Sequence, residues 1–206
     1  MSETSSSVLT RMGAAFGSMP PALWRLLLVL AVFLVGGIAG WIGRGVLAGP
    51  ADVPTMSVYE DWHLLCPALK TKDGACEISQ DVYEQRAGER LARIILAKEK
   101  DKSMVMYVTV PLQVLLEPGI GLKLGNDQVR VYQYKTCTEE GCLAVIPVDD
   151  QLLASLTKAQ DAGIDVAQPN GKAAELPFSM KGYADAYGAF LNNEAKRKSW
   201  WRRLWS

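Results

Sequence analysis

Histidine is almost absent from this 206-residue chain, which contains only His63. A hydrolase triad built on histidine would have to use that side chain, and no nucleophile elbow accompanies it. The glycine-containing segment 119–124 lacks the spacing of a phosphate loop. Two acidic pairs, Glu139–Glu140 and Asp149–Asp150, are sequence neighbours and fit a turn and a helix cap better than an acid–base couple. We therefore expect no catalytic residue, no cofactor and no enzyme activity.

A broad basic surface is also missing, although the net charge of the whole chain is zero. The first 50 residues hold three arginines and one glutamate, and residues 194–206 hold five cations and one glutamate. This leaves 14 cations and 20 acids for residues 51–193, a net charge of −6. Nucleic-acid binding needs cations over the folded surface, so the charge distribution argues against a nucleic-acid partner.

Cysteine is scarce but even in number, with four residues in two local pairs. Cys66 lies near Cys76, and Cys137 lies near Cys142, as expected of disulfides in an oxidising compartment. A redox-active pair would favour the two-residue spacing of thioredoxin-like motifs, and gaps of nine and four residues are not those of the usual zinc knuckles. We expect structural disulfides and no metal site, with a thiol redox protein as the lesser alternative.

The longest uncharged apolar run covers residues 26–42. Its 17 residues are at the lower end of what spans a hydrocarbon core about 30 Å thick. Trp24 and Trp41 lie near its ends, where indoles anchor helices at the membrane interface. The run predicts a transmembrane helix over residues 23–47.

The alternative to an anchor is a cleaved secretory signal peptide, with cleavage near Ala48. A long preceding segment and Arg44 in the would-be cleavage region favour a retained helix. Arg11 and Arg25 precede the run, which slightly favours a cytoplasmic, disordered N-terminus over residues 1–22. Either reading exports the rest of the chain, and the retained anchor predicts an inner-membrane protein with a periplasmic domain.

Small residues form a stripe on the predicted helix. Gly36, Gly40 and Gly43 lie three or four residues apart, which allows a second helix to approach closely. Glycine is also simply frequent in spanning helices. We expect either a membrane-protein partner or a homo-oligomer through this face.

The C-terminal residues 193–206 are rich in cations and tryptophan. This composition is typical of an amphipathic helix that lies in the membrane interface, so the lipid bilayer is the expected partner. The alternative is a disordered solubilising end, for which three indoles are poorly suited. The expected membrane-surface residues are Lys196, Arg197, Lys198, Trp200, Trp201, Arg202, Arg203 and Trp205.

Between a short linker at 48–56 and the tail, residues 57–192 predict a mainly β domain. Segment 91–96 is ambiguous between helix and strand. Asp149 or Asp150 begins a short helix, and residues 182–192 predict a terminal helix. The many short strands favour a β-sandwich or a partly closed barrel with one or two short helices. The expected strands lie at 58–64, 76–80, 104–110, 122–124, 129–134, 142–148, 164–166 and 176–180.

Several motifs in the same order resemble the invasion-associated locus B family of alphaproteobacterial envelope proteins, over about residues 57–192. The resemblance implies a small, exported β-rich domain with structural disulfides, and the family name implies a link to host-cell invasion. The long N-terminal extension and the tail depart from the simpler family pattern. The motifs are Trp62 with Cys66, 76–80, 110–112, 114–119, 137–142, and 177–183 with Ala186.

These features lead to one main hypothesis and two alternatives. The main hypothesis is a non-enzymatic, membrane-anchored periplasmic protein that docks on or stabilises an envelope protein or membrane complex, as an accessory subunit. The first alternative is a secreted or surface virulence factor with a cleaved signal peptide. The lesser alternative is a periplasmic thiol redox protein.

Overall fold

The computed structural model describes residues 20–48, 53–68, 71, 74–84, 88–101 and 103–199. Contacts between residues divide the chain into two compact units, Met1–Gly49 and Pro50–Ser206. Each unit is described by itself.

The described part of the first unit is the helix α2, Pro21–Ala48. It begins with proline, whose fixed φ suits the first position of a helix and whose missing N–H would have no partner there. Within it, Pro21–Gly43 is long and apolar enough to cross a membrane, with a mean hydropathy of 2.5. Its apolar side chains from Leu23 to Ile42 are exposed within the chain. A signal sequence near an N-terminus meets the same criterion, so the helix alone does not separate an anchor from a signal peptide.

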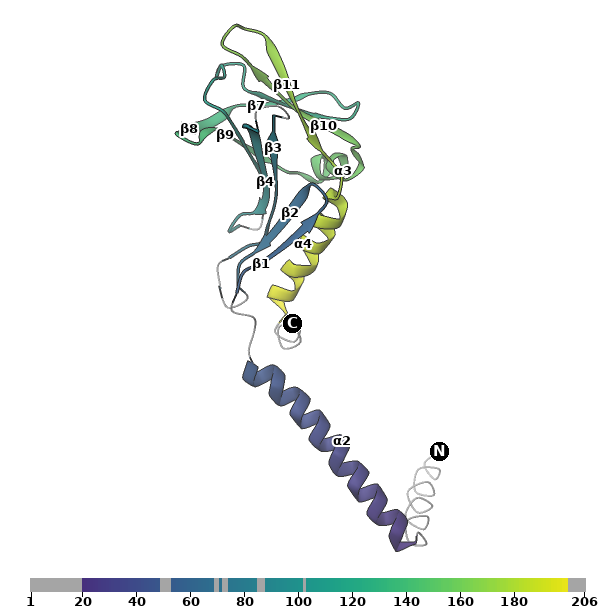
Figure 1. Cartoon of the computed structure of the whole chain (residues 1–206). Coiled ribbons are helices and arrows are strands. Elements are labelled where there is room, and N and C mark those ends of the chain that lie inside the picture. The colour runs from purple at the N-terminus through teal and green to yellow at the C-terminus, as the bar shows by residue number, and fades with distance from the viewer. Residues whose placement is uncertain are drawn as a thin grey trace, which may run out of the picture. The chain divides into compact units, whose positions relative to one another are not determined.

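The second unit contains two antiparallel sheets (Figure 1). In the described residues, one sheet has the strand order β1-β2-β3-β4-β5-β9-β8 and the other the order β11-β10-β6-β7. Both orders are open, so the structure selects the sandwich over the partly closed barrel. The strands are β1 Thr55–Tyr59, β2 Trp62–Cys66, β3 Glu77–Tyr83, β4 Arg90–Lys98, β5 Met104–Val110, β6 Ile120–Leu124, β7 Arg130–Tyr132, β8 Tyr134–Thr138, β9 Gly141–Pro147, β10 Asp161–Ala167 and β11 Ala173–Ser179.

Alternation along the strands places one continuous apolar core between the sheets. In β4 and β5, Ile94 pairs with Val108 and Leu96 with Met106, and all four side chains are buried. Successive side chains of a strand point to opposite faces, so the residues between them face outward. The facing sheet supplies the buried residues Ile120, Leu122, Ile164 and Val166.

Two short helices complete the second unit. Helix α3, Asp150–Lys158, is capped by Asp149, whose Oδ1 accepts a hydrogen bond from the Leu152 N–H at 2.6 Å. Helix α4, Tyr183–Lys198, packs on β1, β2 and β3, and Figure 1 shows it beside β1 and β2. It buries Tyr183 and Phe190 against the end of the sheet that the smaller sheet leaves uncovered.

The prediction of one strand over 58–64 is wrong, because a turn at Glu60–Asp61 divides this segment into the hairpin β1–β2. Glu60 takes a φ of 51°, which sequence reasoning expects of glycine or asparagine rather than glutamate. The ambiguous segment 91–96 is the centre of β4. The strand β8 was not predicted as an element of its own.

Candidate functional site

The end of the sandwich at which β1 begins and β2 ends carries three hydrogen bonds between α4 and the segment that joins β2 to β3. The Cys66–Cys76 disulfide closes the segment between β2 and β3, with Cα atoms 4.2 Å apart. Both cysteines are buried. The disulfide therefore fixes a loop at this end, as the local cysteine pairing predicts.

The last turns of α4 are bonded to this loop. Glu194 Oε1 accepts a hydrogen bond from the Cys76 N–H at 3.1 Å. The Arg197 guanidinium donates from Nη1 to the Gly74 carbonyl at 3.0 Å and from Nη2 to the Pro67 carbonyl. Positions three apart lie on one helix face, so Glu194 and Arg197 can both form hydrogen bonds with the backbone of this loop. Sequence reasoning missed Glu194, whose only signal is this spacing relative to Arg197.

The predicted membrane-surface residues divide into three groups. Lys196 and Lys198 are exposed on α4. Arg197 is half-buried, and its guanidinium is engaged by the loop carbonyls rather than presented to a surface. The remaining residues, Trp200, Trp201, Arg202, Arg203 and Trp205, lie outside the described residues.

The predicted helix-packing glycines lie on α2, in the first unit. A Cβ added at Gly36, Gly40 or Gly43 would meet no other atom within 4 Å in the described residues. The stripe is thus open for close approach by a helix outside this chain, and its role stays a prediction.

The second disulfide, Cys137–Cys142, lies at the opposite edge of the large sheet, where it joins opposed residues of β8 and β9. Gly141 takes a φ of 135° there, and a Cβ would lie 2.2 Å from the Val110 carbonyl oxygen. Glu140 is exposed, and the hydrogen bond that it accepts from the Thr138 hydroxyl holds its pKa below the usual range. The acidic pair 139–140 therefore belongs to a tight turn, as predicted.

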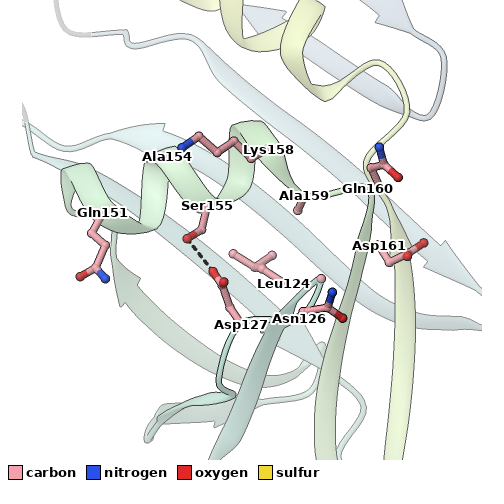
Figure 2. A pocket seen from close by; sticks show the side chains of 11 residues that line it. Leu124, Asn126, Asp127, Gln151, Ala154, Ser155, Lys158, Ala159, Gln160 and Asp161 are labelled. Carbon is pink, nitrogen blue, oxygen red and sulfur yellow. Dashed lines mark hydrogen bonds between the residues drawn. The ribbon is translucent and has the colours of Figure 1, made fainter.

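The described part of the sandwich has several surface hollows, of which two of the larger ones border the sheets and α3. One, of about 660 Å³, lies between the two sheets beside the Gly141 turn; it has an apolar floor that includes Val110 and Leu176 and a rim that includes Glu89. The other, of about 510 Å³, lies between α3 and the turn after β6 (Figure 2). There the Ser155 hydroxyl donates to Asp127 Oδ2 at 2.7 Å. Neither hollow was predicted, since its lining comes from segments far apart in the sequence.

The side chains best suited to catalysis or metal binding lie apart from one another in the fold. His63 lies on β2 opposite Ser79 of β3, on the outward face of the large sheet. Asp149 caps α3, and Asp150 lies in its first turn. Within the described residues, no group of three or more His, Cys, Asp or Glu side chains is arranged to hold a metal ion.

In the core, Trp62 and Gln80 from the N-terminal part of the domain contact residues from its C-terminal part. The Trp62 indole N–H donates to the Ser179 carbonyl at 2.9 Å, and its ring packs edge-on against Tyr183, with centroids 5.1 Å apart. Gln80 is the one buried polar side chain of the described residues. Motif residues that resemble the invasion-associated locus B pattern therefore meet at one place in the fold.

Comparison with known proteins agrees with that arrangement. The family model described as "Invasion associated locus B (IalB) protein" matches residues 62–191. The chain belongs to the IalB family. The matched IalB segment begins at β2 and ends within α4, so β1, Glu194 and Arg197 lie outside it.

The relatives found share this IalB domain. Invasion protein B homologues from Brucella abortus, strain 2308 and biovar 1 strain 9-941, are each 23% identical over 139 residues, which is 66% of this chain and 80% of the relative. The crystal structure of invasion associated protein b from Bartonella henselae has a TM-score of 0.60 and 16% identity, covering 68% of this chain and 99% of that one. That likeness shows the IalB fold for the sandwich of this chain.

Proposed function

We propose that this IalB-family chain is a non-enzymatic, single-pass inner-membrane protein whose sandwich lies in the periplasm and docks on or stabilises another envelope protein or membrane complex. In this role it acts as an accessory subunit. The apolar helix α2 holds it in the membrane, and the cationic segment after α4 makes a second contact with the bilayer surface.

One observation carries the proposal: both chain connections of the sandwich lie at the same end. Thr55 at the start of β1 pairs with Cys66, next to the disulfide loop. Arg197, near the end of α4, donates to carbonyls of that same loop. The connection from the apolar helix and the connection to the cationic tail therefore leave the domain side by side. Two membrane contacts from one end of a domain reinforce each other, because the second contact becomes intramolecular.

The placement of the polar side chains supports a binding role over catalysis. Both cysteine pairs form disulfides, and the acidic pairs serve a turn and a helix cap. The surface contains hollows with mixed lining, and among the described residues no group of three or more His, Cys, Asp or Glu side chains is arranged to hold a metal ion.

The proposal is tested by membrane extraction and purification of the full chain. Carbonate washing should leave the protein in the membrane pellet, and its intact mass should include residues 1–48. Affinity purification in mild detergent should recover a defined membrane protein in constant proportion. A soluble chain, or a membrane-bound particle that never contains a second protein species, would contradict the anchor or the docking role respectively.

A second candidate is a secreted or surface invasion factor, favoured by the names of the Brucella and Bartonella relatives. It requires cleavage of the apolar segment near Ala48, so a mature N-terminus close to that residue, measured by mass, would select it. A thiol redox protein is the third candidate. Labelling of the native, unreduced protein distinguishes it, because two intact disulfides leave no thiol to react.

A further inference from the structure

Strand β1 forms one edge of the seven-stranded sheet, with β2 on its inner side and no described strand on its outer side. A free edge presents unpaired backbone N–H and C=O groups that can bond to another strand. Met56 is 65% exposed and Val58 is 60% exposed, on the same face of β1. The edge thus offers both backbone hydrogen bonds and an apolar contact.

The other three sheet edges carry features that oppose strand addition, and β1 does not. The edge β8 has a register irregularity between Tyr134 and Thr136. The edge β11 contains Pro177, which cannot donate, and β7 is only three residues long. Strand β1 is five residues long, pairs in continuous register with β2, and contains no charge and no proline. Natural proteins protect edges with such devices, so an unprotected edge points to a partner.

We propose that β1 pairs with β1 of a second copy of the same chain, antiparallel and centred on Ser57. This pairing joins the two large sheets into one continuous sheet across a two-fold axis. It adds to the proposed function a defined self-association surface, and β1 lies outside the segment that matches the IalB family.

The register follows from the hairpin. Tyr59 flanks the two-residue turn Glu60–Asp61, so it forms a hydrogen-bonded pair with its partner on β2, and such pairs recur at every second residue. The backbone groups of Ser57 therefore face β2, whereas those of Met56 and Val58 face the open edge. Two-fold pairing about Ser57 places Met56 opposite Val58 of the second copy. Each outward backbone group then finds a partner, and the two exposed apolar side chains cover each other.

The charge distribution also favours a second copy of this chain as the partner of β1. The acidic turn Glu60–Asp61 lies at one end of β1. Lys196 and Lys198 lie in the last turn of α4, which ends beside the disulfide loop at the other end of β1. Antiparallel pairing brings the acidic turn of each copy toward the cationic end of the other. A symmetric interface needs a self-complementary surface of this kind. The membrane anchor of the proposed function would raise the local concentration of copies, so that a short interface would be sufficient. Self-association rests on the proposed function only through this local concentration.

The test uses cysteine cross-linking of the full chain in native membrane vesicles. In Ser57→Cys the two new cysteines face each other at a non-hydrogen-bonded pair, where Cα atoms are about 4.5 Å apart. That separation lies within the range for a disulfide, roughly 4.4–6.8 Å. The matched control is Thr55→Cys, which is also exposed but lies roughly 14 Å from its counterpart in this register. Mild oxidation should give a covalent dimer at least about tenfold more abundant for Ser57→Cys than for Thr55→Cys.

A second variant separates strand pairing from association through α2 alone. Val58→Lys in the Ser57→Cys background places a charge on the exposed edge and should abolish the covalent dimer while leaving the fold intact. Equal cross-linking of the two cysteine variants, no cross-linking, or a dimer that persists with Val58→Lys would each overturn the proposal. If a strand of another protein or the bilayer covers β1 instead, no cross-linking is expected. Carbonate resistance and a co-purifying protein would persist in that case, so the proposed function would still stand.

Discussion

Gln80 on β3 and Ser179 at the end of β11 are joined by two hydrogen bonds, although 99 residues separate them in the sequence. Gln80 Nε2 donates to the Ser179 carbonyl at 3.2 Å, and the Ser179 N–H donates to Gln80 Oε1 at 3.0 Å. The same Nε2 donates to the Asp61 carbonyl at 3.0 Å. One buried amide thus fixes the β1–β2 turn and the entry to α4 relative to the large sheet.

Replacing Gln80 with leucine should destabilise the domain strongly. The variant leaves the part-buried Ser179 N–H without its partner and removes the hydrogen bond to the Asp61 carbonyl, and a polar group left unsatisfied away from water costs about 1–3 kcal/mol. We expect a loss of about 2–4 kcal/mol in the free energy of unfolding, measured by urea denaturation. Gln151→Leu is the control, because Gln151 is exposed on α3. Equal stability of the two variants would show that the buried amide contributes little.

Removing the Arg197 side chain should release the end of α4 from the disulfide loop. Arg197→Ala loses the bonds to the Gly74 and Pro67 carbonyls, so amide hydrogen exchange should accelerate over the last turn of α4 and at Cys76. Exchange in β4 and β5 should not change. Lys198→Ala removes the same charge from an exposed position and should leave exchange unaltered. Similar exchange in both variants would contradict the role of Arg197 in positioning the helix.

Elements with strong local signals could be predicted from the sequence. Strand β5 was predicted with its observed bounds because its residues alternate and favour β structure. The helix N-cap was predicted at Asp149 or Asp150, and Asp149 is the observed one; it could be predicted because capping depends on residues only three positions apart. The local pairing of all four cysteines and the apolar helix could also be predicted, because their signals lie in short stretches of sequence.

The features that could not be predicted depend on contacts between distant segments. The turn at Glu60–Asp61 has no glycine or proline, and its conformation is held by Gln80 and by the close approach of Gly182 to Tyr59. The Arg197–Gly74 hydrogen bond joins residues 123 positions apart. No periodicity or spacing in the sequence encodes such pairs, because the fold alone brings them together.

Tyr183 should make the domain sensitive to alkaline pH. Burial raises the pKa of its hydroxyl, which has no hydrogen-bond partner among the described residues. An unfolded chain releases this proton near pH 10 while the folded chain retains it, so stability is full below about pH 10 and falls as the pH rises above it. Tyr183→Phe should be as stable as the parent or more stable at pH 7, and should lose less stability between pH 9 and 11. The exposed Tyr83→Phe should follow the parent curve, and an unchanged pH profile for Tyr183→Phe would exclude this tyrosine as the cause.

Gly182 and Gly171 give a matched test of close packing at the start of α4. Both have nearly the same positive φ, 77° and 78°, which costs a residue with a Cβ about 1–2 kcal/mol. A Cβ at Gly171 meets nothing within 4 Å, whereas a Cβ at Gly182 would lie 2.0 Å from the Tyr59 carbonyl oxygen. Gly182→Ala should therefore add an overpacking cost of about 1–3 kcal/mol to the conformational one. Because the carbonyl that must move belongs to β1, Gly182→Ala should also increase exchange of the β1 amides. Gly171→Ala should leave β1 protected, and a Gly182→Ala variant as stable as Gly171→Ala would show that β1 and α4 can separate at little cost.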